Sequence, residues 1–318
     1  MNSGLLFCPG IQAGSLAIRG IVTPMITPLL SREKLDVDGL ERLTDRLIKG
    51  GVSGLFLLGT TGEFAAMSHK LRRKLIVTTM GIVRERIPVF VGISDTSIME
   101  SLQLANCAAD AGATACVVTA PYYYHYAEPL MGDYLTEIAA KSPLPLILYN
   151  MPENTGVNFE LETVRRVIQN PRFIAMKDSG GDLNYFAKVS KLASERSDFS
   201  LLMGPDTLLG QAMTLRAGGG VNSGSNLCPE IFVGMYNAAL ENDRDLMAYY
   251  QRSIELLNRI YWVPRQSLGV ICGLKTALGM LGICNEYINP PSRGVGEDER
   301  MEIREIVKLL YPGVKLRS

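Results

Sequence analysis

The sequence predicts an α/β chain that folds as a (β/α)8 TIM barrel with a C-terminal helical extension. Short apolar runs alternate with longer stretches of helical periodicity along most of the chain. The apolar runs are mostly continuous, which is typical of parallel strands covered on both faces. A doubly wound sheet is the alternative, but Thr23-Pro24-Met25 at the end of the first run lacks the glycine fingerprint of that fold.

Eight apolar runs are predicted to be the barrel strands. In chain order they are Gly20–Met25, Gly54–Leu58, Val89–Gly92, Ala115–Val118, Leu146–Tyr149, Ile174–Lys177, Ser200–Met203 and Gly220–Ser223. Residues that favour turns or loops follow most of these runs and give the strands defined ends. This strand count, with a helix after each strand, is that of a (β/α)8 barrel.

Helical periodicity and stop signals mark the segments between the strands. In the first of them Leu40, Leu43 and Leu47 share one face, as in an amphipathic helix. The predicted helices are Asp38–Lys49, His69–Val83, Ile98–Ala111, Leu130–Ala140, Leu161–Gln169, Asp182–Ser194, Thr207–Ala217 and Pro229–Glu241. We interpret Gly218–Gly220 as the stop signal of the helix before the last strand.

Three more helical segments follow the barrel, at Asp243–Ile260, Gly269–Leu281 and Glu297–Leu310. The predicted organisation is an N-terminal extension over 1–18, the barrel over 19–241 and a C-terminal helical region over 242–318. The last region is expected to pack on the barrel or on a partner chain. No linker rich in Pro, Gly or Ser separates an independent domain.

Composition excludes several classes of function. The 318 residues carry a formal net charge of zero, so the basic surface of a nucleic-acid-binding protein is not expected. No apolar run is long enough to span a membrane, and the start has no basic region typical of a secretory signal. The six cysteines show no CxxC spacing and there are two histidines, which argues against a metal site. Buried free thiols in a reducing cytoplasm are predicted instead.

In a barrel enzyme the reaction takes place at the carboxyl ends of the strands. Strand six lies within the stretch Phe173–Asp182 and ends at Lys177, after four apolar residues. Burial disfavours the charged ammonium, and a neutral lysine can attack a carbonyl to form a Schiff base. The alternatives are that Lys177 extends to solvent or forms an ion pair with Asp178.

Other strand ends carry polar residues, and each of these can be interpreted either as part of an active site or as an ordinary structural feature. Gly59–Glu63 contains Thr60 and Thr61, whose amides and hydroxyls suit a carboxylate, although the motif also fits a plain turn. Tyr149 at the end of strand five suits general acid–base catalysis, or is a buried tyrosine with one hydrogen bond. Tyr122–Tyr124 could relay protons or form an aromatic interface.

The lysine, the tyrosine and the threonine pair are all predicted to lie on one face of the barrel. We therefore expect Schiff-base chemistry on a 2-oxo acid, in which the amine takes the ketone and the threonines take the carboxylate. No cofactor is expected besides the covalent imine on Lys177. Ser179 is a candidate contact to a substrate hydroxyl. The alternative from another class is a non-catalytic barrel that binds a small acid.

These motifs resemble those of a known family. Gly59–Glu63, Tyr149–Pro152 with Thr155-Gly156, and Lys177 at these separations are similar to the dihydrodipicolinate synthase/N-acetylneuraminate lyase family. The resemblance covers about Arg19 to Leu310. It implies a class I lyase on a (β/α)8 barrel that acts on a small 2-oxo acid and an aldehyde. It also implies a homo-oligomer, usually a tetramer and otherwise a dimer.

The resemblance implies a role for each matching residue. Lys177 forms the Schiff base with pyruvate or the matching 2-oxo acid, and Tyr149 shuttles protons. Thr60 links Tyr149 to Tyr123, a relay that in the synthase takes its second tyrosine from a neighbouring subunit. Thr60 and Thr61 hold the 2-oxo carboxylate.

The subfamily depends on residues around the far end of the substrate. The synthase has an arginine where this chain has Asn154, preceded by Glu153. Loss of that carboxylate-binding arginine favours a 4-hydroxy-2-oxo acid or 2-keto-3-deoxy sugar acid aldolase. The alternatives are the synthase, a 2-keto-3-deoxy acid dehydratase, or an N-acetylneuraminate lyase, in which Gly204 and Asp206 would meet sugar hydroxyls. The backbone at Asn222 is expected beside the pyruvyl group.

Overall fold

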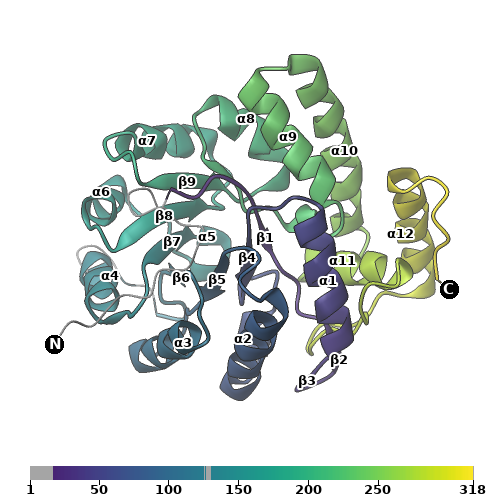
Figure 1. The fold of residues 1–318 in the computed structure, drawn as a ribbon, viewed down its shortest axis with the longest axis horizontal. Coiled ribbons are helices and arrows are strands. Elements are labelled where there is room, and N and C mark those ends of the chain that lie inside the picture. Colours follow the sequence, from purple (N-terminus) through teal and green to yellow (C-terminus); the bar gives the residue numbers. More distant parts are fainter. Residues whose placement is uncertain (1–16, 125, 127–129, 318) are drawn as a thin grey trace.

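Eight parallel strands close into a barrel in the computed structural model, which describes residues 17–124, 126 and 130–317 (Figure 1). In chain order they are β1 (Gly20–Pro24), β4 (Gly54–Leu57), β5 (Val89–Gly92), β6 (Ala115–Thr119), β7 (Leu146–Asn150), β8 (Phe173–Asp178), β9 (Ser200–Met203) and β10 (Gly219–Gly220). Each pairs with the next, and β10 pairs with β1. The predicted (β/α)8 barrel is confirmed. Most of the predicted N-terminal extension, residues 1–16, lies outside the described residues.

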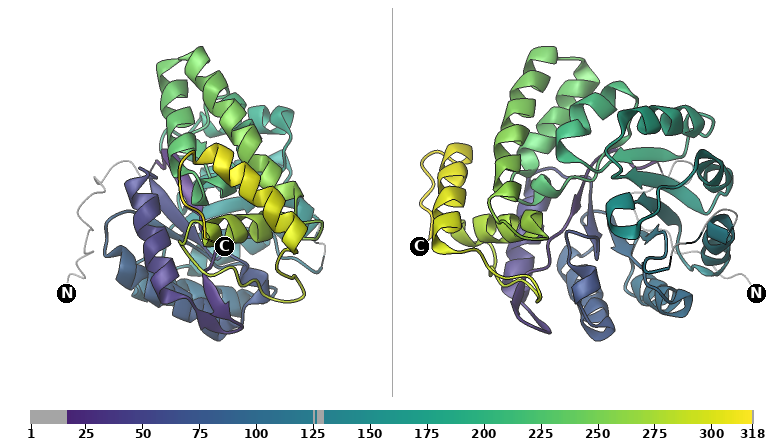
Figure 2. Two further views of the ribbon diagram at one scale, coloured as in Figure 1. Left: turned by 90° about the vertical axis from the view of Figure 1, so that its right-hand side faces the viewer. Right: turned by 180° about the vertical axis from the view of Figure 1, so that it is seen from behind.

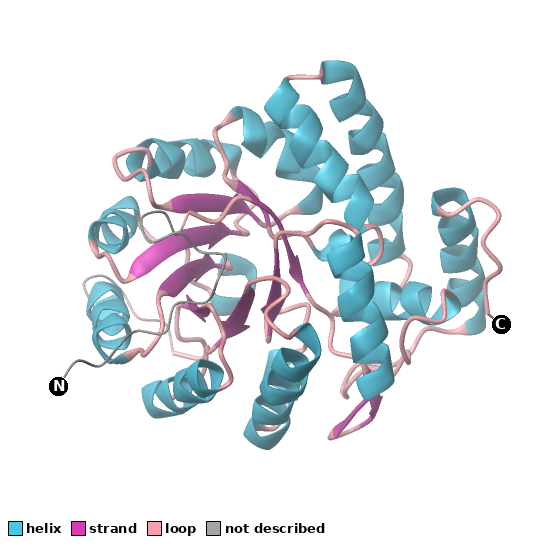
Figure 3. Cartoon of the chain, in the orientation of Figure 1, coloured by secondary structure: helices cyan, strands magenta, loops and turns pink. Residues whose placement is uncertain are grey.

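A helix follows each strand and covers the outside of the barrel (Figure 3). These helices are α1 (Val37–Lys49), α2 (His69–Val83), α3 (Ile98–Asp110), α4 (Leu130–Lys141), α6 (Leu161–Gln169), α7 (Leu183–Ala193), α8 (Leu209–Thr214) and α9 (Pro229–Glu241). Ser68 and Asp182 cap α2 and α7 through their side chains. The hairpin of β2 (Leu29–Ser31) and β3 (Lys34–Leu35) and the short α5 (Pro152–Thr155) were not predicted.

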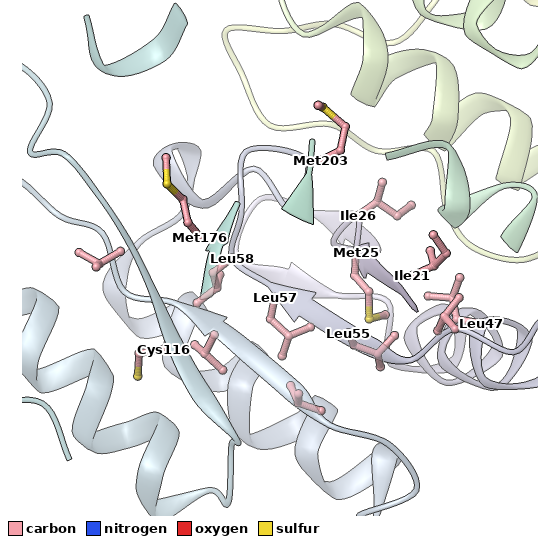
Figure 4. Close-up of a cluster of buried hydrophobic side chains, with 14 of the residues drawn as sticks. Ile21, Met25, Ile26, Leu47, Leu55, Leu57, Leu58, Cys116, Met176 and Met203 are labelled. Atoms are coloured by element: carbon pink, nitrogen blue, oxygen red, sulfur yellow. The ribbon is translucent and has the colours of Figure 1, made fainter. Parts of the chain in front are cut away.

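Side chains along each strand alternate between the barrel interior and the surrounding helices. The interior holds a small apolar cluster that includes Phe56, Phe90 and Leu202. A larger cluster fills the space between strands and helices. Figure 4 labels part of it: Ile21, Met25, Ile26, Leu47, Leu55, Leu57, Leu58, Cys116, Met176 and Met203. Both faces of the sheet are therefore covered, which explains why its strands read as nearly continuous apolar runs.

The last barrel strand differs from the prediction. The residues that we interpreted as a helix stop, Gly219 and Gly220, form β10 themselves, and Ser223 begins a short 3₁₀ helix, η3 (Ser223–Asn226). Gly219 has a φ of +152°, and a Cβ atom there would lie 1.8 Å from the carbonyl oxygen of Gly20. Glycine is therefore required for β10 to approach β1 closely enough to close the barrel.

Three helices form the C-terminal region: α10 (Arg244–Trp262), α11 (Gly269–Met280) and α12 (Glu297–Leu310). Helix α10 packs against α9 and α11, and α12 lies at the outer edge beside both α10 and α11 (Figures 1 and 2). No helix in the described part of the chain is long and apolar enough to cross a membrane.

A buried ion pair joins this region to the loop after β4. Lys275 of α11 and Glu63 are both fully buried and contact each other directly. The Lys275 Nζ also donates to the Tyr287 carbonyl at 2.6 Å, and Glu63 Oε2 accepts from the Asn289 amide at 2.9 Å. The pair therefore fixes the end of the Gly59–Glu63 loop from behind.

Replacing Lys275 by Met is expected to destabilise the fold, because Glu63 would stay buried without its partner. Breaking a buried pair in this way costs about 3–5 kcal/mol. Urea unfolding followed by circular dichroism measures the change. The matched control is Lys141→Met, which removes an exposed pair with Glu137 and should cost only about 0–1 kcal/mol. Equal effects of the two substitutions would contradict the role of the buried pair.

Candidate active site

Strand register places Tyr149 directly beside Lys177. The two residues are paired across the parallel strands β7 and β8. Both point into the barrel, where the Lys177 Nζ lies 4.0 Å from the ring centroid of Tyr149 and 5.3 Å from that of Phe56. Lys177 is only 5% exposed. The predicted pair thus comes together at the carboxyl end of the barrel.

The next residues along the same strands, Asn150 and Asp178, also pair with each other. The Asn150 Nδ2 donates to Asp178 Oδ1 at 2.7 Å, and the Gly180 amide donates to the same oxygen at 3.2 Å. Burial raises the pKa of Asp178, although these hydrogen bonds oppose the shift. Among the described residues, Lys177 and Asp178 form no ion pair, since side chains of successive strand residues point to opposite faces.

The Tyr149 hydroxyl lies at the centre of a small polar group. It is 3.4 Å from Thr60 Oγ1. Burial raises its pKa, but the charge of Lys177 and hydrogen bonds with Thr60, Lys177 and Ser179 together lower the pKa below its ordinary value. A tyrosine with a lowered pKa gives and takes protons more readily near neutral pH. This geometry suits general acid–base catalysis next to an amine.

The threonine loop is held in place by contacts that sequence reasoning missed. Thr61 Oγ1 and Ser223 Oγ lie 2.8 Å apart, and Thr27 Oγ1 donates to the Gly62 carbonyl at 2.8 Å. Asn226 ties η3 to the end of β1, because its Oδ1 accepts from the Ile26 amide at 3.0 Å. The hydroxyls of two loops therefore meet at the carboxyl ends of the strands, an arrangement whose chemistry suits a carboxylate.

A cavity of about 700 Å³ opens above these residues. The residues nominated from the sequence that line it are Lys177, Tyr149, Thr60, Thr61, Ser179, Gly204, Asp206 and Asn154. A more open groove of about 740 Å³ runs between α2 and α3, but the residues that line it come from those two helices and their ends, and from no strand end. We therefore choose the candidate active site by the chemistry of the lining residues and not by volume. The candidate active site is the first cavity.

Two nominated residues do not line the cavity. Tyr123 is 81% exposed and packs against Tyr124, with ring centroids 5.2 Å apart. The Asn222 side chain is fully buried behind the cavity and donates to the carbonyls of Met203 and Gly204, at 3.3 and 3.0 Å. Its role in this chain is to join the ends of β9 and β10, while its neighbours Val221 and Ser223 line the cavity.

Gly204 and Asp206 line the cavity, and both also make close contacts with other residues of the protein. A Cβ atom on Gly204 would lie 2.0 Å from Ser179 Oγ, so only glycine leaves space for that hydroxyl. Asp206 Oδ2 accepts from the Gly224 amide at 2.9 Å and from the Tyr261 hydroxyl at 2.6 Å. Burial raises the pKa of Asp206 to about 6, against the effect of these hydrogen bonds. Asp206 thus positions the loop of Ser223.

The outer wall of the cavity comes from Trp262 at the end of α10, from residues 264–268 between α10 and α11, and from residues 269–271 at the start of α11. Sequence reasoning missed this segment because it follows a helix and lies at no strand end. Asn258 and Tyr261 of α10 also reach the cavity. The site is therefore built by the barrel and the C-terminal helices together.

Comparison with known proteins agrees with this geometry. Residues 17–310 match the model of the Dihydrodipicolinate synthetase family. A 4-hydroxy-tetrahydrodipicolinate synthase from Methanothrix thermoacetophila is 29% identical over 91% of this chain and 96% of its own. A probable 2-dehydro-3-deoxy-D-pentonate aldolase from Escherichia coli is 32% identical over the same shares.

Solved structures are similar over nearly their whole length. The dihydrodipicolinate synthase of Bacteroides thetaiotaomicron superposes with a TM-score of 0.90 at 42% identity, covering 92% of this chain and 99% of its own. A prophage protein of the dihydrodipicolinic acid synthase family from Escherichia coli, solved in complex with pyruvate, gives a TM-score of 0.86 at 26% identity. It covers 92% of this chain and 98% of its own.

The raised pKa of Asp206 predicts a pH dependence of stability. A carboxyl whose pKa rises from 3.8 to about 6 on folding stabilises the native state below pH 3.8. This contribution is lost as pH rises through about 6, and amounts to about 3 kcal/mol. Asp206→Asn does not titrate, so the stability of the wild type relative to this variant should fall between pH 4 and pH 7.

Chemical unfolding at several pH values measures this difference. Asp110→Asn, at an exposed position on α3, is the control for loss of one carboxylate. Parallel stability curves for the wild type and Asp206→Asn would show that Asp206 does not titrate in this range.

Proposed function

The chain belongs to the dihydrodipicolinate synthetase family, and from this premise we propose that Lys177 carries the imine of the reaction. Members of this family are lyases and aldolases, and the chain is a lyase of the class I aldolase type. The observation that carries the proposal is the Lys177 Nζ at 4.0 Å from the Tyr149 ring, buried at the base of a cavity lined by hydroxyl groups. No cofactor besides the imine takes part.

Imine formation begins when the Lys177 amine attacks the 2-oxo carbon of the substrate. The carbinolamine then loses its hydroxyl as water, for which Tyr149 supplies the proton. Thr60 stays within reach of Tyr149 at 3.4 Å and fixes the orientation of the phenol. The hydroxyls of Thr61 and Ser223, 2.8 Å apart, bind the carboxylate next to the imine.

Bond cleavage uses the imine as an electron sink. Tyr149, as phenolate, takes the proton from the C4 hydroxyl of the substrate. The C3–C4 electron pair moves toward the iminium nitrogen, which leaves an enamine and releases an aldehyde. Tyr149 then returns the proton to C3. Water hydrolyses the iminium to pyruvate and the Lys177 amine, and the proton released in this step goes back to Tyr149. Each of these steps is reversible, so the same groups can also catalyse condensation of pyruvate with an aldehyde.

The preferred substrate is a 4-hydroxy-2-oxo acid or a 2-keto-3-deoxy sugar acid. Asn154 lines the cavity where the resemblance places the arginine of a synthase, and Glu153 beside it adds a negative charge. The relative named as a probable 2-dehydro-3-deoxy-D-pentonate aldolase supports this choice. The second candidate is a dihydrodipicolinate synthase, which the name of the 42% identical structure favours.

A second copy of the chain would complete the proton relay through Tyr123. This residue is 81% exposed, and its φ of +90° is unusual for a side chain with a Cβ atom. Strained backbone of this kind concentrates at functional sites. We propose a homo-oligomer, a tetramer or a dimer, in which Tyr123 reaches Thr60 of a neighbouring subunit. The free thiols of the described cysteines fit a reducing cytoplasm.

Borohydride reduction in the presence of pyruvate tests the imine. Mass spectrometry of the digested protein should show one reduced pyruvyl adduct, on Lys177. Lys177→Arg should give no adduct and lose activity by on the order of 10⁴-fold or more. The control Lys191→Arg, at an exposed position on α7, should keep both adduct and activity. An adduct on another lysine, or unchanged activity of Lys177→Arg, would rule out the mechanism.

A substrate panel distinguishes the two candidate functions. 4-Hydroxy-2-oxoglutarate and 2-keto-3-deoxygluconate should be cleaved, whereas condensation of pyruvate with aspartate semialdehyde should be slow. Asn154→Arg should raise turnover of the semialdehyde by about 10- to 100-fold, because the arginine binds its carboxylate. Fast turnover of aspartate semialdehyde by the unmodified chain would show that it is a synthase.

A further inference from the structure

The cavity continues outward beyond the reach of a pyruvyl group on Lys177. Its inner end is formed by strand ends, and its outer wall by Trp262 of α10, residues 264–268 and the start of α11. A pyruvyl group fills only a small part of about 700 Å³. The outer wall therefore faces the part of the substrate that becomes the aldehyde.

Arg265 supplies the positive charge of this wall. Among the described residues that line the cavity, Lys177 and Arg265 are the cationic ones. No ion pair joins the Arg265 guanidinium to an acidic side chain of the described residues. The pKa of Glu299 is lowered mainly by hydrogen bonds from the Gly296 and Arg265 amides, and the charge of Arg265 lowers it further. Arg265 is exposed and also lines an adjoining hollow of about 510 Å³ that includes Glu299. An anion in the cavity would therefore compete with Glu299 for the guanidinium.

The backbone that carries Arg265 is held firmly. The Arg265 amide donates to Glu299 Oε1 of α12 at 3.2 Å. The neighbouring Gln266 donates through Nε2 to the Arg293 carbonyl at 2.7 Å and accepts from the Arg293 amide at 3.1 Å. These contacts hold the backbone from which the Arg265 side chain extends along the cavity wall, which reduces the entropy cost of binding.

The α5 part of the cavity lining offers no cation. Here Asn154 is neutral and Glu153 is acidic. A carboxylate at the far end of a substrate would therefore find its counter-charge at Arg265. Glu153 would repel the second negative charge of a phosphate, so a carboxylate fits this lining better.

We propose that Arg265 is a specificity-determining residue that binds a carboxylate at the far end of the substrate. The chain then prefers 2-oxo acids with a second carboxylate over 2-keto-3-deoxy sugar acids, whose far end carries only hydroxyl groups. A guanidinium can bind a carboxylate through two parallel hydrogen bonds, which a neutral hydroxyl cannot replace. The inference rests on the proposed function, because the Lys177 imine fixes the other end of the substrate.

Two matched ligands test whether Arg265 binds the far carboxylate, and the test needs no catalytic turnover. 2-Oxoglutarate and 2-oxopentanoate have the same chain length, but 2-oxopentanoate ends in a methyl group. Calorimetry should show that the unmodified protein binds 2-oxoglutarate more tightly. Arg265→Gln should weaken binding of 2-oxoglutarate by about 10- to 100-fold and leave binding of 2-oxopentanoate unchanged. Arg265→Lys should keep part of the preference.

Control variants distinguish loss of carboxylate binding by Arg265 from a general disturbance of the loop that carries it. Arg259→Gln, at an exposed position on α10 outside the cavity lining, should keep the full preference for 2-oxoglutarate. Adding Asn154→Arg to Arg265→Gln should restore the preference, because the new arginine supplies a positive charge from α5. Equal weakening of both ligands by Arg265→Gln, or no preference in the unmodified protein, would overturn the proposal. Loss of the borohydride adduct with an intact ligand preference would overturn the imine instead.

Discussion

The site depends on the register between β7 and β8. This register places Tyr149 beside Lys177 inside the barrel and Asn150 beside Asp178 outside it. A shift by one residue would exchange the faces, since side chains alternate along a strand. The amine would then face the helices, and Asp178 would enter the cavity. The hydrogen bond of 2.7 Å between Asn150 and Asp178 supports the register that keeps the reacting groups together.

The C-terminal helices take part in the site as well as in the fold. Lys275 of α11 neutralises Glu63 behind the threonine loop, and Tyr261 of α10 donates to Asp206, which in turn holds the loop of Ser223. The connection between α10 and α11 contributes Arg265. In the proposed mechanism, barrel strand ends provide the groups that react, whereas the appended helices fix their loops and line the outer part of the cavity. This division suits one reaction on different substrates.

Sequence reasoning was most successful where a local pattern has one physical cause. Continuous apolar runs predicted the strands, and a lysine at the end of such a run predicted the buried amine. It was wrong for β10, where two glycines form the strand because only glycine permits the approach to Gly20. Tyr123 and Asn222 were nominated by motif, but neither lines the cavity of its own chain. Asp206 and Gly204 do line the cavity. Asp206 accepts a hydrogen bond from the Gly224 amide, and Gly204 leaves space for the Ser179 hydroxyl.

The sequence by itself determined the barrel, its order of elements and the residues Lys177, Tyr149, Thr60 and Thr61, because periodicity and strand ends are local properties. It also determined that Asn154 is neutral. Only the tertiary structure decided that Ser223 meets Thr61, that Asp206 is held by Tyr261, and that Arg265 faces the cavity. These contacts join segments far apart in the chain. Their existence depends on how the helices pack on the barrel, which no local pattern encodes.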